Sequence, residues 1–132
     1  MSEHLKRAEE LRAITERHYN CAQSVFVPFA KECGLDEEQA YKVAANFGAG
    51  MKVAGTCGAI TGGLMVLGML GVEDPAVIRN YFQAFKDNHE GCTDCVDLLR
   101  INAQAGKEKK PHCDAMVYEA VKVVEKILAE QK

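Results

Sequence analysis

The chain has 132 residues, of which 48% are hydrophobic and 27% charged, a balance typical of a globular protein rather than a disordered one. Its formal net charge of -3 excludes the extended basic surface used in nucleic-acid binding. We therefore expect one domain over residues 1–132 that binds no nucleic acid. The only dense positive cluster, GKEKKP, is interpreted as a solvated loop.

The N-terminal segment SEHLKRAEELRAITER is charged throughout and lacks the apolar core of a secretory signal. The longest apolar run, over residues 59–72, is too short to cross a bilayer of roughly 30 Å. These features predict a cytoplasmic protein without membrane insertion. In a reducing compartment, six cysteines are more often metal ligands or redox groups than structural disulfides.

Hydrophobic periodicity and capping residues predict helices along almost the whole chain. A charged helix is expected over about residues 3–18, a second over 21–31 after the cap residue Asn20, and a third over 37–47 after Asp36. The next residues, GAGMKVAGT at 48–56, are expected to form a flexible glycine-rich connection.

The helix expected over residues 58–70 is apolar on nearly all sides, which predicts a central position in the fold. Asp74 and Pro75 open a fifth helix that ends near residue 88. A short sixth segment, CVDLLR, begins after residues 93–94, and a last helix covers 114–130 after the loop INAQAGKEKKPH. No alternating strand pattern occurs. We expect an all-α, compact bundle of about six to seven helices around a central apolar, glycine-containing helix.

Five of the six cysteines fall within one turn of the start of a predicted helix, and the exception, Cys33, is interpreted as a buried core residue. Backbone N–H groups of a first helical turn lack internal partners and stabilise a thiolate, so we expect lowered thiol pKa values at the five positions. Gly58, directly after Cys57, is expected to let amides approach the sulfur atom. Gly62 and Gly63 are expected to allow close helix packing.

Cys92 and Cys95 form a C-x-x-C pair, which is compatible with a metal knuckle, a reactive dithiol or two cluster ligands. Val96 follows the pair, so the C-x-x-C-H motif of haem attachment is absent and no haem is expected. A site built from four dispersed cysteines of several helices remains. His89 and His112 lie near cysteines in sequence and are candidates for ligands or hydrogen-bond donors.

Together these residues resemble the family of redox-active proteins named for its C-GCAxxG-C-C cysteine pattern. The resemblance covers most of the chain and rests on the segments NCAQSV, TCGAITGGLMVLG, CTDCVDLL and HCDAMVYEAV. These segments supply Cys21, Cys57, Cys95 and Cys113. The order Cys-Gly-Ala at residues 57–59 differs from the Gly-Cys-Ala of the family label, and Cys92 is additional.

The resemblance implies an all-helical fold and a redox-linked role. A similar module in split-Soret cytochromes c implies an iron–sulfur cluster and a homodimer, although the haem-binding parts of those cytochromes have no counterpart in this chain. The leading hypothesis is therefore an electron-transfer protein with a [2Fe–2S] or [4Fe–4S] cluster and a partner protein. The expected cofactor-binding residues are Cys21, Cys57, Cys95 and Cys113, with Gly58 beside them and Cys92 as an alternative ligand.

Three alternatives stay open. The first is metal-free thiol–disulfide exchange by Cys92 and Cys95. The second is a structural Zn²⁺ site that uses the same four cysteines, and the third is a helical partner-binding module. No substrate site and no catalytic residue can be identified from the spacing, so an enzymatic role, as an oxidoreductase component, stays open as well.

Overall fold

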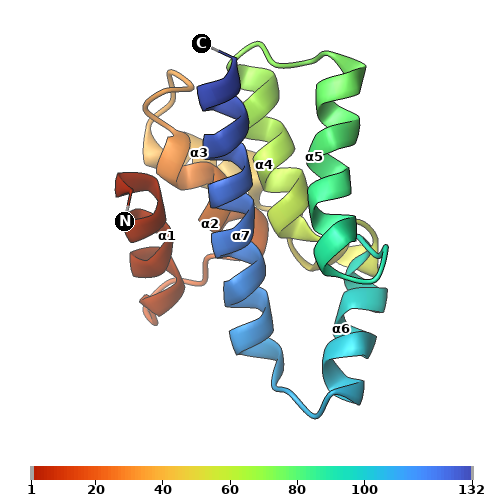
Figure 1. The fold of residues 1–132 in the computed structure, drawn as a ribbon. Helices are drawn as coiled ribbons and strands as arrows, with labels where there is room; N and C mark the ends of the chain where they lie inside the picture. The colour runs from red at the N-terminus through yellow and green to blue at the C-terminus, as the bar shows by residue number, and fades with distance from the viewer. Residues whose placement is uncertain (1, 132) are drawn as a thin grey trace.

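A computed structural model describes residues 2–131, and Figure 1 shows its fold. This part of the chain forms seven α-helices and no strand, which confirms the predicted all-α class. The helices are α1 (Glu3–Ala13), α2 (Cys21–Phe26), α3 (Glu37–Ala44), α4 (Gly58–Met69), α5 (Pro75–Asn88), α6 (Cys95–Gln104) and α7 (Lys109–Glu130). A short 3₁₀-helix, η1 (Val27–Phe29), follows α2, and a tight turn, η2 (Gly50–Ala54), precedes α4.

The long helix α7 runs along the molecule and contacts α1, α2, α4, α5 and α6. In Figure 1, α1 lies to one side of α7, α5 lies to the other, and α6 lies beside the first half of α7. The largest buried side chains are aromatic residues of α2, η1 and α5, namely Phe26, Phe29, Tyr81 and Phe85. One apolar core therefore joins the early and the late parts of the chain.

Helix α4 is buried along most of its length, which confirms its predicted central position. A Cβ atom added at Gly62 would lie 2.7 Å from the carbonyl oxygen of Ala22 in α2. A Cβ atom added at Gly63 would lie 2.9 Å from Cγ2 of Val124 and would collide with the hydroxyl of Tyr81. Both glycines therefore allow neighbouring helices to approach α4, as predicted.

Three helix starts agree with the turn and cap residues of the sequence. Asp74 caps α5 with a 2.8 Å hydrogen bond from the amide of Ala76, and this helix covers the predicted residues 75–88. Asn20 caps α2 and Asp36 caps α3, each with a glutamine three residues later that completes a capping box. Capping chemistry is local, so the sequence indicates these starts well.

Other boundaries differ from the prediction. Helix α1 ends at Ala13 instead of residue 18, α2 ends at Phe26 where η1 follows, and α3 ends at Ala44. Helix α7 begins at Lys109, before the predicted start at residue 114, and includes Pro111 in its first turn. Proline is tolerated there because the first N–H groups of a helix have no internal partner. The connection between α6 and α7 is therefore shorter than the predicted loop.

Residues 48–56 form a left-handed turn rather than a plain connection. Ala49, Gly50, Met51 and Lys52 have consecutive positive φ values of 53°, 62°, 60° and 64°. This conformation costs roughly 1–2 kcal/mol for each residue other than glycine. The turn is closed by a 2.9 Å hydrogen bond from the amide of Gly55 to the carbonyl oxygen of Gly50.

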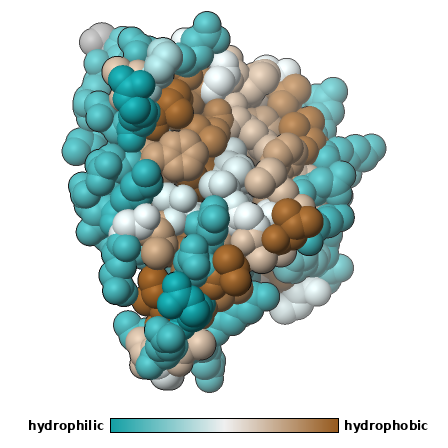
Figure 2. All heavy atoms as spheres, turned by 90° about the vertical axis from the view of Figure 1, so that its right-hand side faces the viewer, coloured by the Kyte–Doolittle hydropathy of each residue, from teal (hydrophilic) through white to brown (hydrophobic). Residues whose placement is uncertain are grey.

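Large apolar side chains that are strongly exposed are few among the described residues, and two of them, Met51 and Val53, belong to η2. Figure 2 shows the face on the side of α5 and α6, where apolar atoms lie among hydrophilic groups. Within residues 2–131, no helix combines the length and the apolar character that a membrane span requires.

Candidate functional site

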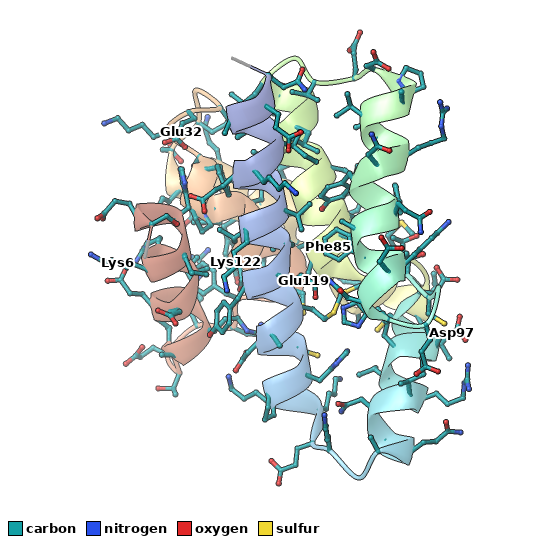
Figure 3. All side chains as sticks on the ribbon, viewed as in Figure 1. Lys6, Glu32, Phe85, Asp97, Glu119 and Lys122 are labelled. Atoms are coloured by element: carbon teal, nitrogen blue, oxygen red, sulfur yellow. The ribbon has the colours of Figure 1, made fainter. Side chains whose placement is uncertain are left out.

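Four of the six cysteines line one cavity of about 710 Å³. They come from four separate places in the fold: the first turns of α2 and α6, the cap position of α4, and the second turn of α7. Several sulfur atoms lie between α7 and α6 in Figure 3. The lining cysteines are Cys21, Cys57, Cys95 and Cys113. The structure thus brings together the four cysteines selected from the sequence.

A short backbone bridge places Cys57 beside Cys95. The amide of Cys57 donates a 2.9 Å hydrogen bond to the carbonyl oxygen of Thr93, and the amide of Cys95 donates a 2.6 Å bond to that of Gly55. These bonds form an isolated antiparallel bridge between Thr56 and Asp94, the residues that precede the two cysteines. The starts of α4 and α6 are therefore tied together by the main chain.

Cys21 is held by the capped start of α2. The side chain of Asn20 accepts a 2.8 Å hydrogen bond from the amide of Gln23 and donates a 3.1 Å bond to the carbonyl oxygen of Ala45. A Cβ atom at Gly48 would lie 2.5 Å from Cβ of Asn20, so glycine is needed where the chain passes this cap. The cap thus positions α2 and the beginning of the left-handed turn together.

Arg12 connects α1 to the Cys113 region of α7. Its Nε donates a 2.6 Å hydrogen bond to Oδ1 of Asp114, and its Nη1 donates a 2.8 Å bond to the carbonyl oxygen of Tyr19. Burial opposes the charge of the guanidinium, but Asp114 and the charges of Cys21 and Cys113 raise the pKa of Arg12. A cation with only 10% of its side chain exposed therefore lies close to two of the thiols.

The thiols of Cys21 and Cys113 interact directly. A hydrogen bond from Cys21, assisted by Arg12 and Lys109, lowers the pKa of Cys113 from 9.0 to about 6. The same hydrogen bond, together with burial, raises the pKa of Cys21. The two thiols therefore lose their protons in two separate steps, which belong to the pair.

Burial decides the protonation of the other two cavity thiols. It raises the pKa of Cys57 to about 11, although the backbone amides of Ala59 and Ile60 favour the thiolate. Burial also raises the pKa of Cys95, with a further contribution from Cys113. The expectation of lowered pKa values at helix starts is therefore wrong for three thiols. Burial is the main cause at Cys57 and Cys95, whereas at Cys21 the interaction with Cys113 acts first and burial second.

The charged side chains that line the cavity are all basic. They are Arg12, Lys52 and Lys109, and two histidines, His18 and His112, join them. Among the lining residues of the described chain, none is an aspartate or a glutamate. Burial, with a smaller contribution from His89, lowers the pKa of His112. The cavity is therefore suited to a negatively charged group.

Cys33 and Cys92 do not line this cavity. Cys33 is buried, as predicted, and burial raises the pKa of its thiol. Cys92 lies at a half-buried position, where its sulfur is 3.7 Å from the carbonyl oxygen of Glu90. The C-x-x-C pair is thus divided: Cys95 faces the cavity with three other thiols, and Cys92 does not.

Gly58 lines the cavity, but its lack of a side chain has a packing explanation. A Cβ atom there would lie 2.9 Å from the carbonyl oxygen of Phe47 and 3.3 Å from the amide nitrogen of Ala22. The backbone amides that favour the thiolate of Cys57 belong to Ala59 and Ile60 and not to Gly58. Close contact between α4 and α2 is therefore sufficient to require this glycine, and a role toward a bound group stays a prediction.

The histidines near the cysteines occupy different positions. His112 lines the cavity, whereas His89 forms a 2.8 Å ion pair through Nε2 with Oε1 of Glu119. Within residues 2–131, no group of three or more histidine, cysteine, aspartate or glutamate side chains is arranged to hold a metal ion. The four thiols surround a space instead of meeting at one point.

Sequence reasoning missed the basic part of this site. Arg12 was interpreted as a member of the charged first helix, and Lys109 as part of a solvated loop. Arg12 and Asp114 are 102 residues apart, and no local pattern links them. Only the packing of α1 against α7 reveals that these charges belong to the thiol cavity.

The fold and the site define an all-helical protein whose dispersed thiols share one basic cavity. The family described as "Putative redox-active protein (C_GCAxxG_C_C)" matches residues 19–127. The chain belongs to this family, which confirms the resemblance inferred from its cysteine segments. No curated protein and no solved structure matches the chain.

Proposed function

We propose that this protein binds an iron–sulfur cluster through four cysteines and transfers electrons to a partner protein. The single observation that carries the proposal is the convergence of four thiols from four helix starts on one cavity. The proposed ligands are Cys21, Cys57, Cys95 and Cys113.

The chemistry of the cavity supports a cluster as the bound group. Four cysteine thiolates are the common ligand set of [2Fe–2S] and [4Fe–4S] centres, which supply one-electron redox chemistry when bound. A volume of about 710 Å³ leaves room for a group of several atoms. The basic lining favours the thiolate forms that ligation requires and offsets a negative charge in the cavity.

Individual residues of the chain contribute to this role. Arg12 and Lys109 provide positive charge near Cys113. The backbone amides of Ala59 and Ile60, at the start of α4, favour the thiolate of Cys57. The bridge at Thr56 fixes the spacing of two ligand-bearing segments without using their side chains.

Anaerobic reconstitution with ferrous iron and sulfide tests the proposal. We expect brown protein with visible absorption and stoichiometric iron and sulfide. Single substitutions of the four cavity cysteines by alanine should reduce bound iron strongly. The controls Cys33→Ala and Cys92→Ala should retain it, because neither thiol lines the cavity. Circular dichroism of each variant separates loss of ligation from loss of folding.

Two results would contradict the proposal. Colourless protein without iron after reconstitution would remove the cluster. Iron loss in Cys92→Ala together with full iron in Cys21→Ala would assign a different ligand set. Stoichiometric zinc in place of iron, measured by elemental analysis of the isolated protein, would favour the structural zinc site.

A second candidate function is thiol–disulfide exchange by Cys21 and Cys113, favoured by their positions on one cavity and by the lowered pKa of Cys113. The thiolate of Cys113 would attack a small-molecule disulfide, form a mixed disulfide and release one thiolate. Cys21, after losing its proton, would displace the second thiolate and leave a Cys21–Cys113 disulfide. The pair is oxidised by two electrons and the small disulfide is reduced to two thiols.

Glutathione disulfide and cluster-free protein test this second function. Peptide mass spectrometry should find a bond between Cys21 and Cys113, in preference to the Cys92–Cys95 pair considered from the sequence. A mixed disulfide that persists at Cys113 in the Cys21→Ser variant would identify the attacking sulfur. Oxidation confined to Cys92 and Cys95 would exclude the cavity pair.

A homodimer and a cytoplasmic location remain part of the proposal. The homodimer rests on the similarity to the split-Soret module, and the location rests on six cysteines that form no disulfide. Sedimentation of the reconstituted protein tests the first, and fractionation of cells tests the second.

A further inference from the structure

A second cavity adjoins the thiol cavity at Cys113. Its volume is about 390 Å³, and it is enclosed by residues of α1, the 14–19 segment and the start of α7. Cys113, Arg12, His18 and Lys109 line both cavities. One cysteine of the proposed redox centre therefore also faces a separate space on the side of α1.

The charges around the second cavity are mainly positive. Arg12, Lys109 and Lys110 line it, and within the described chain no carboxylate does. Asp114 is the nearest acidic group on α7. It accepts a 2.6 Å hydrogen bond from Nε of Arg12 and pairs with Nζ of Lys110 at 3.0 Å. Three cations against one carboxylate leave an excess of positive charge.

Part of this positive charge is open to a ligand. Among the described residues, Lys109 forms no ion pair, and Nη2 of Arg12 makes no hydrogen bond. Because every buried polar side-chain atom of the described chain has a partner, this Nη2 is in contact with solvent. Leu11 and Ile14 also line this cavity, and their apolar side chains do not compete with a ligand for these cations.

We propose that the second cavity binds a small anion, a carboxylate or an oxyanion of sulfur or phosphorus, next to Cys113. This inference rests on the proposed redox function, because Cys113 is one of the proposed cluster ligands. A cavity of this size admits a small molecule, and guanidinium and ammonium groups are the usual partners of carboxylate and phosphate-like oxygens.

Two alkylating agents of similar size test the charge preference of this cavity. Iodoacetate is an anion and iodoacetamide is neutral; both form a sulfur–carbon bond and release iodide. The rate of each reaction is measured at Cys113 in the reduced, cluster-free full chain by peptide mass spectrometry. Cys92, which lines neither cavity, is the internal control. We expect the ratio of the iodoacetate rate to the iodoacetamide rate to be about threefold to tenfold higher at Cys113.

Lys109→Gln should bring the ratio at Cys113 toward that of Cys92, and Lys110→Gln should lower it less, because Asp114 already pairs with Lys110. Lys107→Gln is the matched control, since this exposed lysine lines neither cavity. Inorganic phosphate should slow the iodoacetamide reaction at Cys113 relative to chloride of equal ionic strength. Equal ratios at the two thiols, an unchanged ratio in Lys109→Gln, or no protection by phosphate would each overturn the proposal.

The alkylation experiment tests the anion site separately from the cluster. A charge preference at Cys113 in a protein that binds no iron would support the anion site and remove the cluster. A reconstituted protein with full iron but no charge preference in its cluster-free form would support the cluster and remove the anion site.

Discussion

Two walls of the thiol cavity are stabilised in different ways. The helical wall, formed by the starts of α2 and α4 and by α7, continues into the apolar core, where Gly62 and Gly63 allow close packing. The turn wall, residues 48–55, has positive φ values at several residues other than glycine and exposes 78% of Val53. Packing fixes the first wall, whereas the second retains an unfavourable backbone conformation beside the proposed ligands.

This difference indicates where the cavity can change shape. Residues held in sparsely populated backbone regions persist only while their surroundings hold them, and such strain is often found at functional sites. The helical wall has no comparable strain in its described residues. We therefore expect an added side chain at a close contact of the helical wall to lower the free energy of unfolding. A glycine at a positive-φ residue of the turn wall should raise it.

The largest effect on stability is expected where α4 packs against α2. Gly62→Ala should lower the free energy of unfolding by about 1–3 kcal/mol, because the new Cβ atom would lie 2.7 Å from the carbonyl oxygen of Ala22. Gly68→Ala is the matched control in the same helix. No atom lies within 4 Å of its added Cβ atom, so it should raise stability by about 0.5–1 kcal/mol.

Urea unfolding of both variants checks this prediction. Equal losses in the two variants would show that α4 lacks the close contact with α2 on which the helical wall depends.

An intermediate effect is expected within the helical wall, at the thiol pair. In cluster-free protein, the alkylation rate of Cys113 should rise with pH around its pKa of about 6, because only the thiolate reacts. Cys21→Ala removes the hydrogen bond that contributes most to this lowered pKa, so the midpoint should move upward toward the ordinary value of 9.0. Cys57, with a pKa of about 11, should stay unreactive at neutral pH.

Rates of iodoacetamide labelling between pH 5 and pH 9 give these midpoints, the upper limit being set near the ordinary thiol pKa. Cys33→Ala is the control and should leave the midpoint of Cys113 unchanged, because its thiol lies outside the cavity. A midpoint that is the same in Cys21→Ala and in the unmodified chain would remove the direct interaction of the two thiols.

The smallest effect is expected in the turn wall. Ala54 has a φ of 58°, which glycine adopts readily, so Ala54→Gly should raise the free energy of unfolding by about 0.5–1 kcal/mol. Ala103→Gly in α6 is the matched control at an exposed helical position, and it should lower stability by a similar amount. Thermal or urea unfolding distinguishes the two signs, and destabilisation by both substitutions would show that the turn is not strained.

The sequence predicts the helical wall better than the turn wall for physical reasons. A local signal such as the Asn20 cap of α2 acts over a few residues, and the structure agrees with it. Met51 and Lys52 carry no local signal for a left-handed conformation, because side chains of their type rarely adopt it. Tertiary contacts impose that conformation.

The candidate site shows the same division. Its cysteines could be selected from their positions in the sequence and from the family pattern, and the structure places all four on one cavity. Its charges could not be selected, because Arg12 reaches Asp114 only when α1 packs against α7. The sequence also suggested thiolates at every helix start, but burial dominates at Cys57 and Cys95. Desolvation depends on the whole fold.

The bridge between Thr56 and Asp94 has a consequence for protein engineering. Since main-chain hydrogen bonds join the segments before residues 57 and 95, these bonds do not depend on which side chains the two residues carry. Histidine or carboxylate side chains could be introduced at these two positions, and the pair offers a template for redesigning what the cavity coordinates.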